Sequence, residues 1–489
     1  MQGTRIHLMV GGLLLASACF SVQAEALHPD PAWQQGELAN GFSWQFLDTP
    51  QRPSDRIELR LLVNTGSLVE SSQQLGFAHL LPRLAMTRSE SFTPEQLHAL
   101  WQQGVDNDRP LPPAITSYDF TMYNLSLPNN RPDLLKEALA WLSDTAGKLK
   151  LDQETVRMAV DSNADPIGIL PPNPKDAWWR YRLKGSALLA HDPGEPVTRP
   201  VNLEQLQKFY QQWYTPDVMT LYVVGKVDGR SLNEQINKAF SPLEGKREMP
   251  APMPTLTPLP PLPVSMMSDE IAQDRLSIMW DKPWHPIRDS QSLLSYWRSD
   301  LAREALFWHL QQTLENSSQK EMKLSFDCRV QYQRAQCAIH LDTPNANLNA
   351  GLEFVAQEMA NMRNNGLSQQ AFDDLLAQKN DQLSKLFATY ARTDTDVLMS
   401  QRLRSQQNGV VDISPEQYQK LRKEFLSTLT LESLNQALKL QLSQEATLVL
   451  LQPKGEPEMN MKQLQDNYNR IMRPAPAVVS EKVKPVGAQ

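Results

Sequence analysis

The 489-residue sequence is poor in the residue patterns that most enzymes use for covalent or metal chemistry. It contains three cysteines and eight histidines, and no two histidines lie within one helical turn of each other. No single helix can therefore present a two-histidine metal chelate. The sequence also lacks a G-x-S-x-G element, a Walker phosphate-binding loop, and a G-x-G-x-x-G turn after a strand. These absences argue against the common serine hydrolases, nucleotide hydrolases and dinucleotide-binding enzymes.

An excess of basic charge is also missing, and so are long apolar runs. Lysine and arginine together number 48 against 55 aspartates and glutamates, which gives a formal net charge of −7. This acidic balance disfavours a nucleic-acid partner, because phosphates attract basic surfaces. No apolar stretch approaches the roughly 18 residues that a membrane-spanning helix needs. We therefore expect no nucleic-acid partner and no transmembrane segment.

The N-terminus has the features of a secretory signal peptide, which we assign to residues 1–24. Arg5 provides a short basic region, and the apolar run that follows at residues 8–16 is too short to cross a membrane. Small residues near the end of the segment favour cleavage after Ala24, with cleavage after Ala26 as the alternative. These features predict an exported, periplasmic protein.

Signal cleavage removes Cys19 and leaves Cys328 and Cys337. Each of these two cysteines lies in a stretch of alternating apolar and polar residues, which is typical of a strand. A hairpin centred between Tyr332 and Gln333 would place the two thiols opposite each other. In an exported protein this arrangement favours a disulfide, and a pair of reduced, buried thiols is the alternative. The sequence leaves the two interpretations evenly balanced.

A proline-rich stretch divides the chain at residues 247–266. Its seven prolines oppose helix formation and favour an extended, semi-rigid spacer. We therefore predict an N-terminal domain at 25–246, a C-terminal domain at 267–455, and a partly disordered tail at 456–489. Each predicted domain mixes alternating strands with helices, and hairpin spacings dominate. This pattern indicates an α+β fold with mostly antiparallel sheets.

Four segments, taken in order, resemble the pitrilysin/insulinase family of zinc metallopeptidases, also called inverzincins. Leu38–Phe42 is similar to the family's first strand, L-x-N-G-L, and Gly66–Glu70 is similar to its G-S-x-x-E turn. Thr116–Tyr123 resembles its T-S-x-D-x-T-x-Y strand, and residues 203–225 resemble its late helix and strand. The resemblance implies two tandem repeats that face each other across a cavity. The second repeat, at about residues 268–452, matches more weakly and has no site motif, as is usual in the family.

Residues 75–86 resemble the site helix of that family, in which G-x-A-H-x-x-E-H supplies two zinc-binding histidines and a glutamate general base. His79 stands at the first ligand position. Pro82 stands where the glutamate is expected, and Arg83 stands where the second histidine is expected. Proline has no side-chain base, and a guanidinium repels a metal dication. The resemblance therefore predicts a degenerate site with no catalytic residue and no metal ligand set.

The third zinc ligand of the family is a distant glutamate on a second helix, and the alignment puts Asp165 or Pro166 at its position. Without zinc, the two helices need another link. We expect Arg83 to form an ion pair with Asp161 or Asp165 on the second helix, because a fixed positive charge then replaces the metal.

Two prolines bear on the same region. Pro82 inside a helix would remove the bond to the carbonyl of Ala78 at a cost of about 3 kcal/mol, so we expect the helix to begin near Leu81 or to bend. Pro113 aligns with the edge strand through which the family grips extended peptides. Because proline has no N–H to offer an added strand, we expect this edge to have lost its capacity for peptide capture.

These observations predict a non-catalytic metallopeptidase homologue, a pseudoenzyme, with a binding or partner-subunit role and no cofactor. Family members that lack the zinc motif pair with active homologues, so the resemblance implies either a homologous active subunit or a polypeptide ligand as the partner. The alternative is a zinc-dependent endopeptidase that acts through an atypical site. Metal analysis and a peptide-cleavage assay with and without chelator separate the two.

Overall fold

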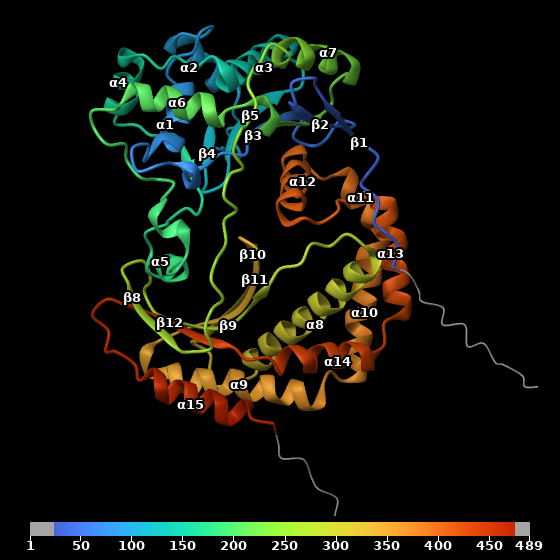
Figure 1. Ribbon diagram of the computed structural model, residues 1–489. Helices are drawn as coiled ribbons and strands as arrows, with labels where there is room; N and C mark the ends of the chain where they lie inside the picture. The colour runs from blue at the N-terminus through green and yellow to red at the C-terminus, as the bar shows by residue number, and fades with distance from the viewer. Residues whose placement is uncertain (1–23, 475–489) are drawn as a thin grey trace, which may run out of the picture.

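The computed structural model describes residues 24–474. Residues 1–23, which include Cys19 and all but the last residue of the predicted signal peptide, lie outside the described residues, as do the last fifteen residues of the predicted tail, 475–489. The described chain forms two α+β halves, one stacked above the other (Figure 1). This arrangement agrees with the expected pair of repeats, each built on one sheet.

The N-terminal half contains a seven-stranded sheet in the order β1-β2-β7-β3-β5-β4-β6. Its strands are β1 (Trp33–Glu37), β2 (Ser43–Asp48), β3 (Arg56–Val63), β4 (Ala114–Thr116), β5 (Thr121–Pro128), β6 (Gly168–Ile169) and β7 (Met219–Gly225). Its helices are α1 (Phe77–Ala85), α2 (Pro94–Gln103), α3 (Pro132–Gly147), α4 (Gln153–Asp161), α5 (Ala177–Leu183), α6 (Leu203–Trp213) and α7 (Gly229–Phe240).

The C-terminal half contains a five-stranded sheet in the order β10-β11-β9-β12-β8. Its strands are β8 (Val264–Ser268), β9 (Asp274–Pro283), β10 (Lys323–Gln331), β11 (Arg334–Thr343) and β12 (Thr447–Pro453). Its helices are α8 (Ser290–Glu315), α9 (Leu348–Asn365), α10 (Gln369–Ser384), α11 (Leu386–Ala391), α12 (Thr395–Asn408), α13 (Pro415–Thr428), α14 (Leu431–Leu442) and α15 (Met461–Met472). The sequence pattern did not predict α11, α12 and α13.

The two halves share one strand topology. In the N-terminal half, β2 runs parallel to β7, and β7 is followed across the sheet by antiparallel β3, β5 and β4. In the C-terminal half, β8 runs parallel to β12, and β12 is followed by antiparallel β9, β11 and β10. The same order and the same directions support an internal duplication, which sequence similarity indicated only weakly.

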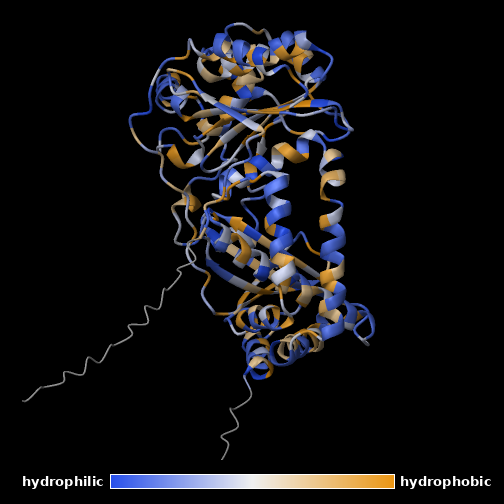
Figure 2. Ribbon diagram, turned by 90° about the vertical axis from the view of Figure 1, so that its right-hand side faces the viewer, coloured by the Kyte–Doolittle hydropathy of each residue, from blue (hydrophilic) through white to orange (hydrophobic). Residues whose placement is uncertain are grey.

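Strand alternation separates an outer and an inner face of each sheet. In β3, Leu59, Leu61 and Val63 are fully buried beneath the covering helices, whereas Glu58 and Arg60 point the other way. We call the second side the inner face, because it is turned toward the opposite half. Figure 2 shows hydrophobic residues gathered where the helices meet the sheets. Each half thus has its own core, as expected for a repeat with one helix layer.

The structure corrects the predicted division of the chain in three places. Val264 is already the first residue of β8, so the proline-rich connection ends three residues earlier than expected, at residue 263. The segment before β1 packs against the C-terminal half, where the amide of Leu27 donates to the carbonyl of Arg288 at 2.9 Å. The tail begins with α15, whose Leu464 is buried in the C-terminal core. The amphipathic spacing of Leu464, Tyr468 and Ile471 indicates a docked helix in the tail, whereas no local pattern assigns the segment before β1 to the C-terminal half.

Each half also extends a helix onto the inner face of the other half. From the C-terminal half, α12 packs Leu398 and Met399 against Tyr222 and Val224 of β7. From the N-terminal half, α5 places Trp178 and Tyr181 against the apolar inner face of the C-terminal sheet. We call these two helices the crossing helices. They occupy corresponding places in the two repeats. In the N-terminal half, α5 comes after α3 and α4 and before the last strand, β7; in the C-terminal half, α12 comes after α9 and α10 and before the last strand, β12.

The crossing helix α12 is held by buried polar contacts. Arg402 is 2% exposed, its Nε donates to Oε1 of Gln45 at 2.9 Å, and its guanidinium lies 4.7 Å from the ring centroid of Trp33. At the start of the helix, Asp394 and Asp396 pair with Arg109 at 3.0 and 2.8 Å. Because a buried arginine is costly unless it is paired, these contacts define one position for α12.

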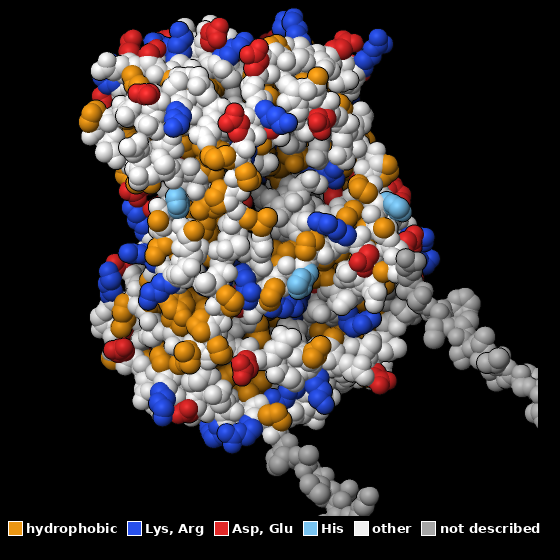
Figure 3. All heavy atoms as spheres, in the orientation of Figure 1, with side chains coloured by type: hydrophobic (Ala, Val, Ile, Leu, Met, Phe, Trp, Pro, Cys, Tyr) orange, Lys and Arg blue, Asp and Glu red, His pale blue; other side chains and the backbone are white. Residues whose placement is uncertain are grey.

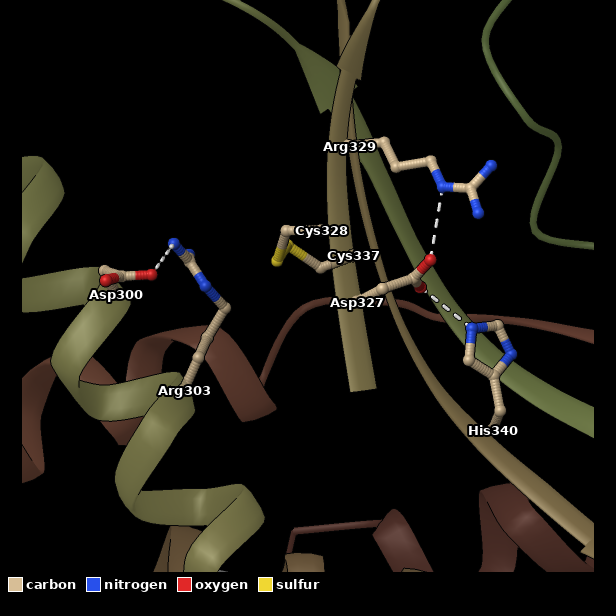
Figure 4. The surroundings of a disulfide bond; sticks show 7 residues. All are labelled: Asp300, Arg303, Asp327, Cys328, Arg329, Cys337 and His340. Carbon is tan, nitrogen blue, oxygen red and sulfur yellow. Dashed lines mark hydrogen bonds and ion pairs between the residues drawn. A yellow bond between two sulfur atoms is a disulfide. The ribbon is translucent and has the colours of Figure 1, made fainter. Parts of the chain in front are cut away.

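A hairpin from the C-terminal half makes the third link between the halves. Cys328 lies opposite Cys337 in the β10–β11 pairing, and a disulfide joins them (Figure 4). Tyr332 and Gln333 at the tip both have positive φ, as two-residue hairpin turns require. The Tyr332 ring contacts Tyr118 of the N-terminal half, with centroids 5.8 Å apart. The disulfide therefore braces a hairpin whose tip touches the other half.

The bond predicts a simple thiol count. The denatured, unreduced mature chain should contain no thiol that reacts with a titrating reagent, and a Cys328→Ser variant should expose one. In the chain-entropy model, closing a loop of this size stabilises the fold by roughly 2–3 kcal/mol, so reduction should lower the melting temperature. Two reactive thiols in the unreduced parent would reject the disulfide and leave the buried-thiol interpretation.

Candidate functional site

The helix that resembles the family's site helix begins where the resemblance places it. Its first residue is Phe77, after Gly76, so the expectation of a start near Leu81 was wrong. Gly76 has a φ of +85°, and a Cβ there would lie 2.7 Å from the carbonyl oxygen of Glu195, so this turn needs glycine. The buried leucines of α1 anchor it in the core, and this packing tolerates Pro82 in the helix interior.

Glu70 closes the N-terminal end of α1. Its Oε2 accepts a hydrogen bond from the amide of Ala78 at 2.8 Å, and the residue is only 5% exposed. Burial raises the pKa of Glu70 to about 8, against the lowering effect of the backbone amides at the helix start. This carboxyl group belongs to the G-S-x-x-E turn, and the structure shows that its role is to hold the start of the site helix.

His79 is bound to an acid and not exposed as a free ligand. Its Nε2 lies 2.6 Å from Oδ2 of Asp165, and its side chain is 11% exposed. The Nδ1 atom of His79 is buried with no hydrogen-bond partner among residues 24–474. We therefore assign the proton to Nε2, which donates to the carboxylate. Burial raises the pKa of Asp165, but the hydrogen bond from His79, the amide of Ile167 and the positive charge of Arg83 outweigh it and lower the pKa below its usual value.

Arg83 links α1 to α4 in a different way from the one expected. Its guanidinium donates to the carbonyls of Ala159 and Ser162 at the C-terminal end of α4. Its Nε is 4.0 Å from Oδ1 of Asp165, the limit of an ion pair. A positive charge at the C-terminal end of a helix is favourable, because the last carbonyls there lack helical partners. Arg83 therefore acts mainly as a cap of α4.

The two acids that were candidates for this ion pair also differ in position from the expectation. Asp161 is the last residue of α4, and it pairs with Arg199 at 3.2 Å. Asp165 lies four residues beyond the end of the helix. The second helix of the resemblance is thus too short to carry a ligand at residue 165, and the coil brings the acid onto His79 by another route.

This donor set does not fit a catalytic zinc ion. A catalytic site needs three protein ligands and an open position for water. Here Nε2 of His79 is bound to Asp165, and Pro82 stands at the position of the family's glutamate. The guanidinium of Arg83 lies where the second histidine ligand is expected. No group of three or more metal-binding side chains was found among the described residues. The residues around His79 form a hydrogen-bonded link between α1 and the segment after α4, and Pro82 offers no side-chain base at the position of the family's glutamate.

The segment after Asp165 also closes the strand that the family uses to grip peptides. Residues Gly168 and Ile169 form β6, which pairs in parallel with Ile115 and Thr116 of β4. The amide of Leu170 then donates to the carbonyl of Thr116 at 2.9 Å. The sequence predicted that Pro113 would spoil this edge. In the structure, a part of the same chain occupies it, so an added peptide finds no free edge there.

A serine, a histidine and an aspartate form a second hydrogen-bonded row in the C-terminal half. Ser277 Oγ lies 2.6 Å from Nδ1 of His340. Nε2 of His340 lies 2.8 Å from Oδ1 of Asp327, a contact drawn in Figure 4. The three residues come from neighbouring strands β9, β11 and β10. Ser277 is only 2% exposed, so a substrate does not reach its hydroxyl in this conformation. The row satisfies buried polar groups in the sheet.

The contacts of Asp165 predict that its energetic coupling to His79 is stronger than its coupling to Arg83. Asp165→Ala combined with His79→Ala should cost clearly less stability than the two single changes summed, because they share one hydrogen bond. Asp165→Ala combined with Arg83→Ala should be nearly additive, because Arg83 mainly binds carbonyls. Thermal or denaturant unfolding of the two double-mutant cycles measures both. A larger coupling with Arg83 would restore the simple ion-pair interpretation.

Glu70 predicts a pH dependence of stability. Its folded pKa of about 8 lies above the unfolded value of 4.5, so the folded chain holds a proton that the unfolded chain releases between these values. The contribution of this proton to the free energy of unfolding is fully present below pH 4.5, and it is lost as the pH rises toward 8. Glu70→Gln should match the parent at pH 5 and exceed it at pH 8 in urea unfolding. The exposed Glu90→Gln control should follow the parent, and a Glu70→Gln variant that does the same would contradict the assignment.

Comparison with known proteins agrees with the geometry. The family model "Insulinase (Peptidase family M16)" matches residues 48–168, and the model "Peptidase M16 inactive domain" matches residues 200–379. The protein named YhjJ of Escherichia coli (strain K12) is 59% identical over 483 residues, which are 99% of this chain and 97% of that relative. Its name describes no activity.

Solved structures place the fold. A predicted insulinase family protease from Yersinia pestis is 70% identical, with a TM-score of 0.91 over 95% of this chain and 100% of that one. The first half of the periplasmic protease PqqL from Escherichia coli has a TM-score of 0.76 at 20% identity, over 92% of this chain and 98% of that one, a likeness that shows the fold alone. Against the whole probable zinc protease PqqL, this chain aligns over 84% of its own length and 45% of the relative's.

The family models cover parts of both halves, and a close relative covers nearly the whole chain. Together they show that this chain belongs to the pitrilysin/insulinase family, the M16 peptidases.

Proposed function

We propose that this chain is an exported, non-catalytic M16 protein that acts by binding a polypeptide. The bound polypeptide is either a homologous active peptidase, for which this chain is a partner subunit, or a separate ligand. The observation that carries the proposal is the state of His79, whose Nε2 is held by Asp165 while Pro82 and Arg83 occupy the next two site positions. A site of this composition lacks both a ligand set and a base.

The closed edge of β4 supports the same conclusion. An active peptidase of this family needs a free strand edge beside its site, and here β6 occupies that edge. The residues on either side of β6 are also tied down, because Asp165 binds His79 and Ile167 is buried in the core. The segment after α4 therefore both occupies His79 and covers the peptide edge. This is expected of a protein that does not hydrolyse peptides.

The compartment is the periplasm in this proposal. The signal-like residues at 1–24 support export, and PqqL, whose first half shares the fold, is described as a periplasmic protease. Among residues 24–474, no helix has both the length and the apolar character needed to cross a membrane.

The alternative is a zinc-dependent endopeptidase with an atypical site. It is favoured by one observation, that related proteins such as PqqL are named as zinc proteases. Under this alternative, zinc would be bound by His79 and acids brought from elsewhere in the chain, and the hydrogen bond to Asp165 would have to open.

Metal content tests the proposal directly. Elemental analysis of the purified mature chain should find no stoichiometric zinc, because two of the site positions are Pro82 and Arg83. Pro82→Glu alone should not restore zinc, since Arg83 remains, and its hydrolysis of unstructured peptides should stay at background with or without chelator. About one zinc per chain, or cleavage that a chelator abolishes, would establish the alternative.

A further inference from the structure

The inner face of the N-terminal sheet carries a cavity that the degenerate site does not use. It has a volume of about 630 Å³ and lies between the sheet and the last turns of crossing helix α12. Figure 3 shows the hollow between the two halves from one side. We call this cavity the chamber trough. Its lining residues are Gln35, Gly36, Glu37, Ser43, Trp44, Gln45, Leu62, Asn64, Asp119, Phe120, Thr220, Tyr222, Leu403, Gln406 and Gln407.

The floor of the chamber trough is a register row across the sheet. Glu37 of β1 lies opposite Ser43 of β2, Ser43 lies opposite Thr220 of β7, and Thr220 lies opposite Leu62 of β3. At the far end, Asp119 stands just before β5. Neighbouring strands lie about 4.8 Å apart, so the four steps from β1 to β5 span about 19 Å. An extended chain of about six residues has this length.

The charges of the chamber trough have one sign. Among residues 24–474, Glu37 and Asp119 are its only charged lining residues, and no lysine or arginine lines it. The strand order puts the two acids at opposite ends. An anionic ligand would be repelled, whereas a ligand with positive charge near both ends would be attracted. Asp119 is also largely shielded from water, which raises its pKa and increases the benefit of a nearby cation.

Amide side chains lie between the two acids. Gln35 and Asn64 reach the trough from the sheet, and Gln406 and Gln407 reach it from α12. All four are exposed, and within residues 24–474 none makes a side-chain hydrogen bond. A carboxamide offers both a donor and an acceptor. This combination matches the N–H and C=O groups of a peptide backbone, whereas a polyamine would use only the acceptors.

We propose that the chamber trough binds an extended polypeptide segment of about six residues with a lysine or arginine toward each end. The proposal rests on the polypeptide-binding role proposed above and names its site and ligand. The site is separate from the degenerate metal site: Glu37 and Asp119 bind the basic side chains, and the amides bind the backbone. The opposite edge of the same sheet, at β4, is closed by β6, so binding moves to the inner face beside β1.

Short fluorescent peptides test this proposal on the mature protein. The peptide Lys-Ser-Gly-Gly-Ser-Lys should bind in an anisotropy titration at low salt, and Glu-Ser-Gly-Gly-Ser-Glu should not. Glu37→Gln and Asp119→Asn should each weaken the lysine peptide about tenfold, which is about 1.4 kcal/mol. Because Glu37 is exposed and its side chain makes no hydrogen bond or ion pair within residues 24–474, Glu37→Gln should fold like the parent. Asp48→Asn, at the exposed end of β2 and outside the trough, is the matched control and should change nothing.

A blocking variant and a competitor complete the design. Gln35→Trp should fill the trough and abolish binding with the melting temperature unchanged. Spermidine at the same concentration should compete poorly, since it cannot use the amide donors. Three results would each contradict the proposed site. They are equal binding of both peptides, unchanged affinity in Glu37→Gln, and displacement by spermidine as efficient as displacement by unlabelled lysine peptide. If the lysine peptide does not bind, and the protein also has no zinc and cleaves no peptide, then only the trough proposal is wrong. Cleavage that a chelator abolishes would instead contradict the proposed non-catalytic function.

Discussion

The hydrogen bond between His79 and Asp165 organises the region where a family peptidase has its catalytic centre. The bond is short, at 2.6 Å, and it draws the chain after α4 across the start of α1. Once Asp165 is held there, the following residues run beside β4, and Gly168 and Ile169 pair with it. One contact therefore accounts for an occupied histidine and for a closed strand edge. Arg83 reinforces the arrangement by capping the helix from which this segment emerges.

The crossing helices explain how two similar halves form one molecule. A sheet with helices on one side leaves its inner face exposed, and each repeat covers part of the other's inner face with a helix. The apolar parts of α12 and α5 bury against the opposite sheet, while Arg402 and the Arg109 cluster hold α12 through polar contacts. The tip of the β10–β11 hairpin adds a third contact, in which the hydroxyl of Tyr332 lies 3.3 Å from the hydroxyl of Ser117. Between these contacts the chamber trough remains uncovered, and many of its lining side chains are polar.

Much of the fold followed from local patterns. Alternation in the two cysteine strands predicted β10 and β11, and the proline-rich stretch predicted the extended connection between the halves. The hairpin turn at Tyr332 was located from symmetry about two cysteines. By contrast, α12 has few apolar residues and no strong amphipathic pattern, so it gave no signal as a packing helix. β6 has two residues, too few for any pattern to register.

The sequence alone determined the family resemblance, which rests on four ordered segments, and the departure from the family's zinc motif, which depends only on the side chains at positions 79, 82 and 83. It also led to the hypothesis that Arg83 links the two helices, since a fixed positive charge stands at a former metal-ligand position. Tertiary structure decided which partners. The end of α4 at Asp161 left free carbonyls within reach of Arg83, and the coil beyond it delivered Asp165 to His79. The chamber trough arises in the same way: Glu37 and Asp119 are 82 positions apart along the chain, and only the strand order and the crossing of α12 bring them to one cavity.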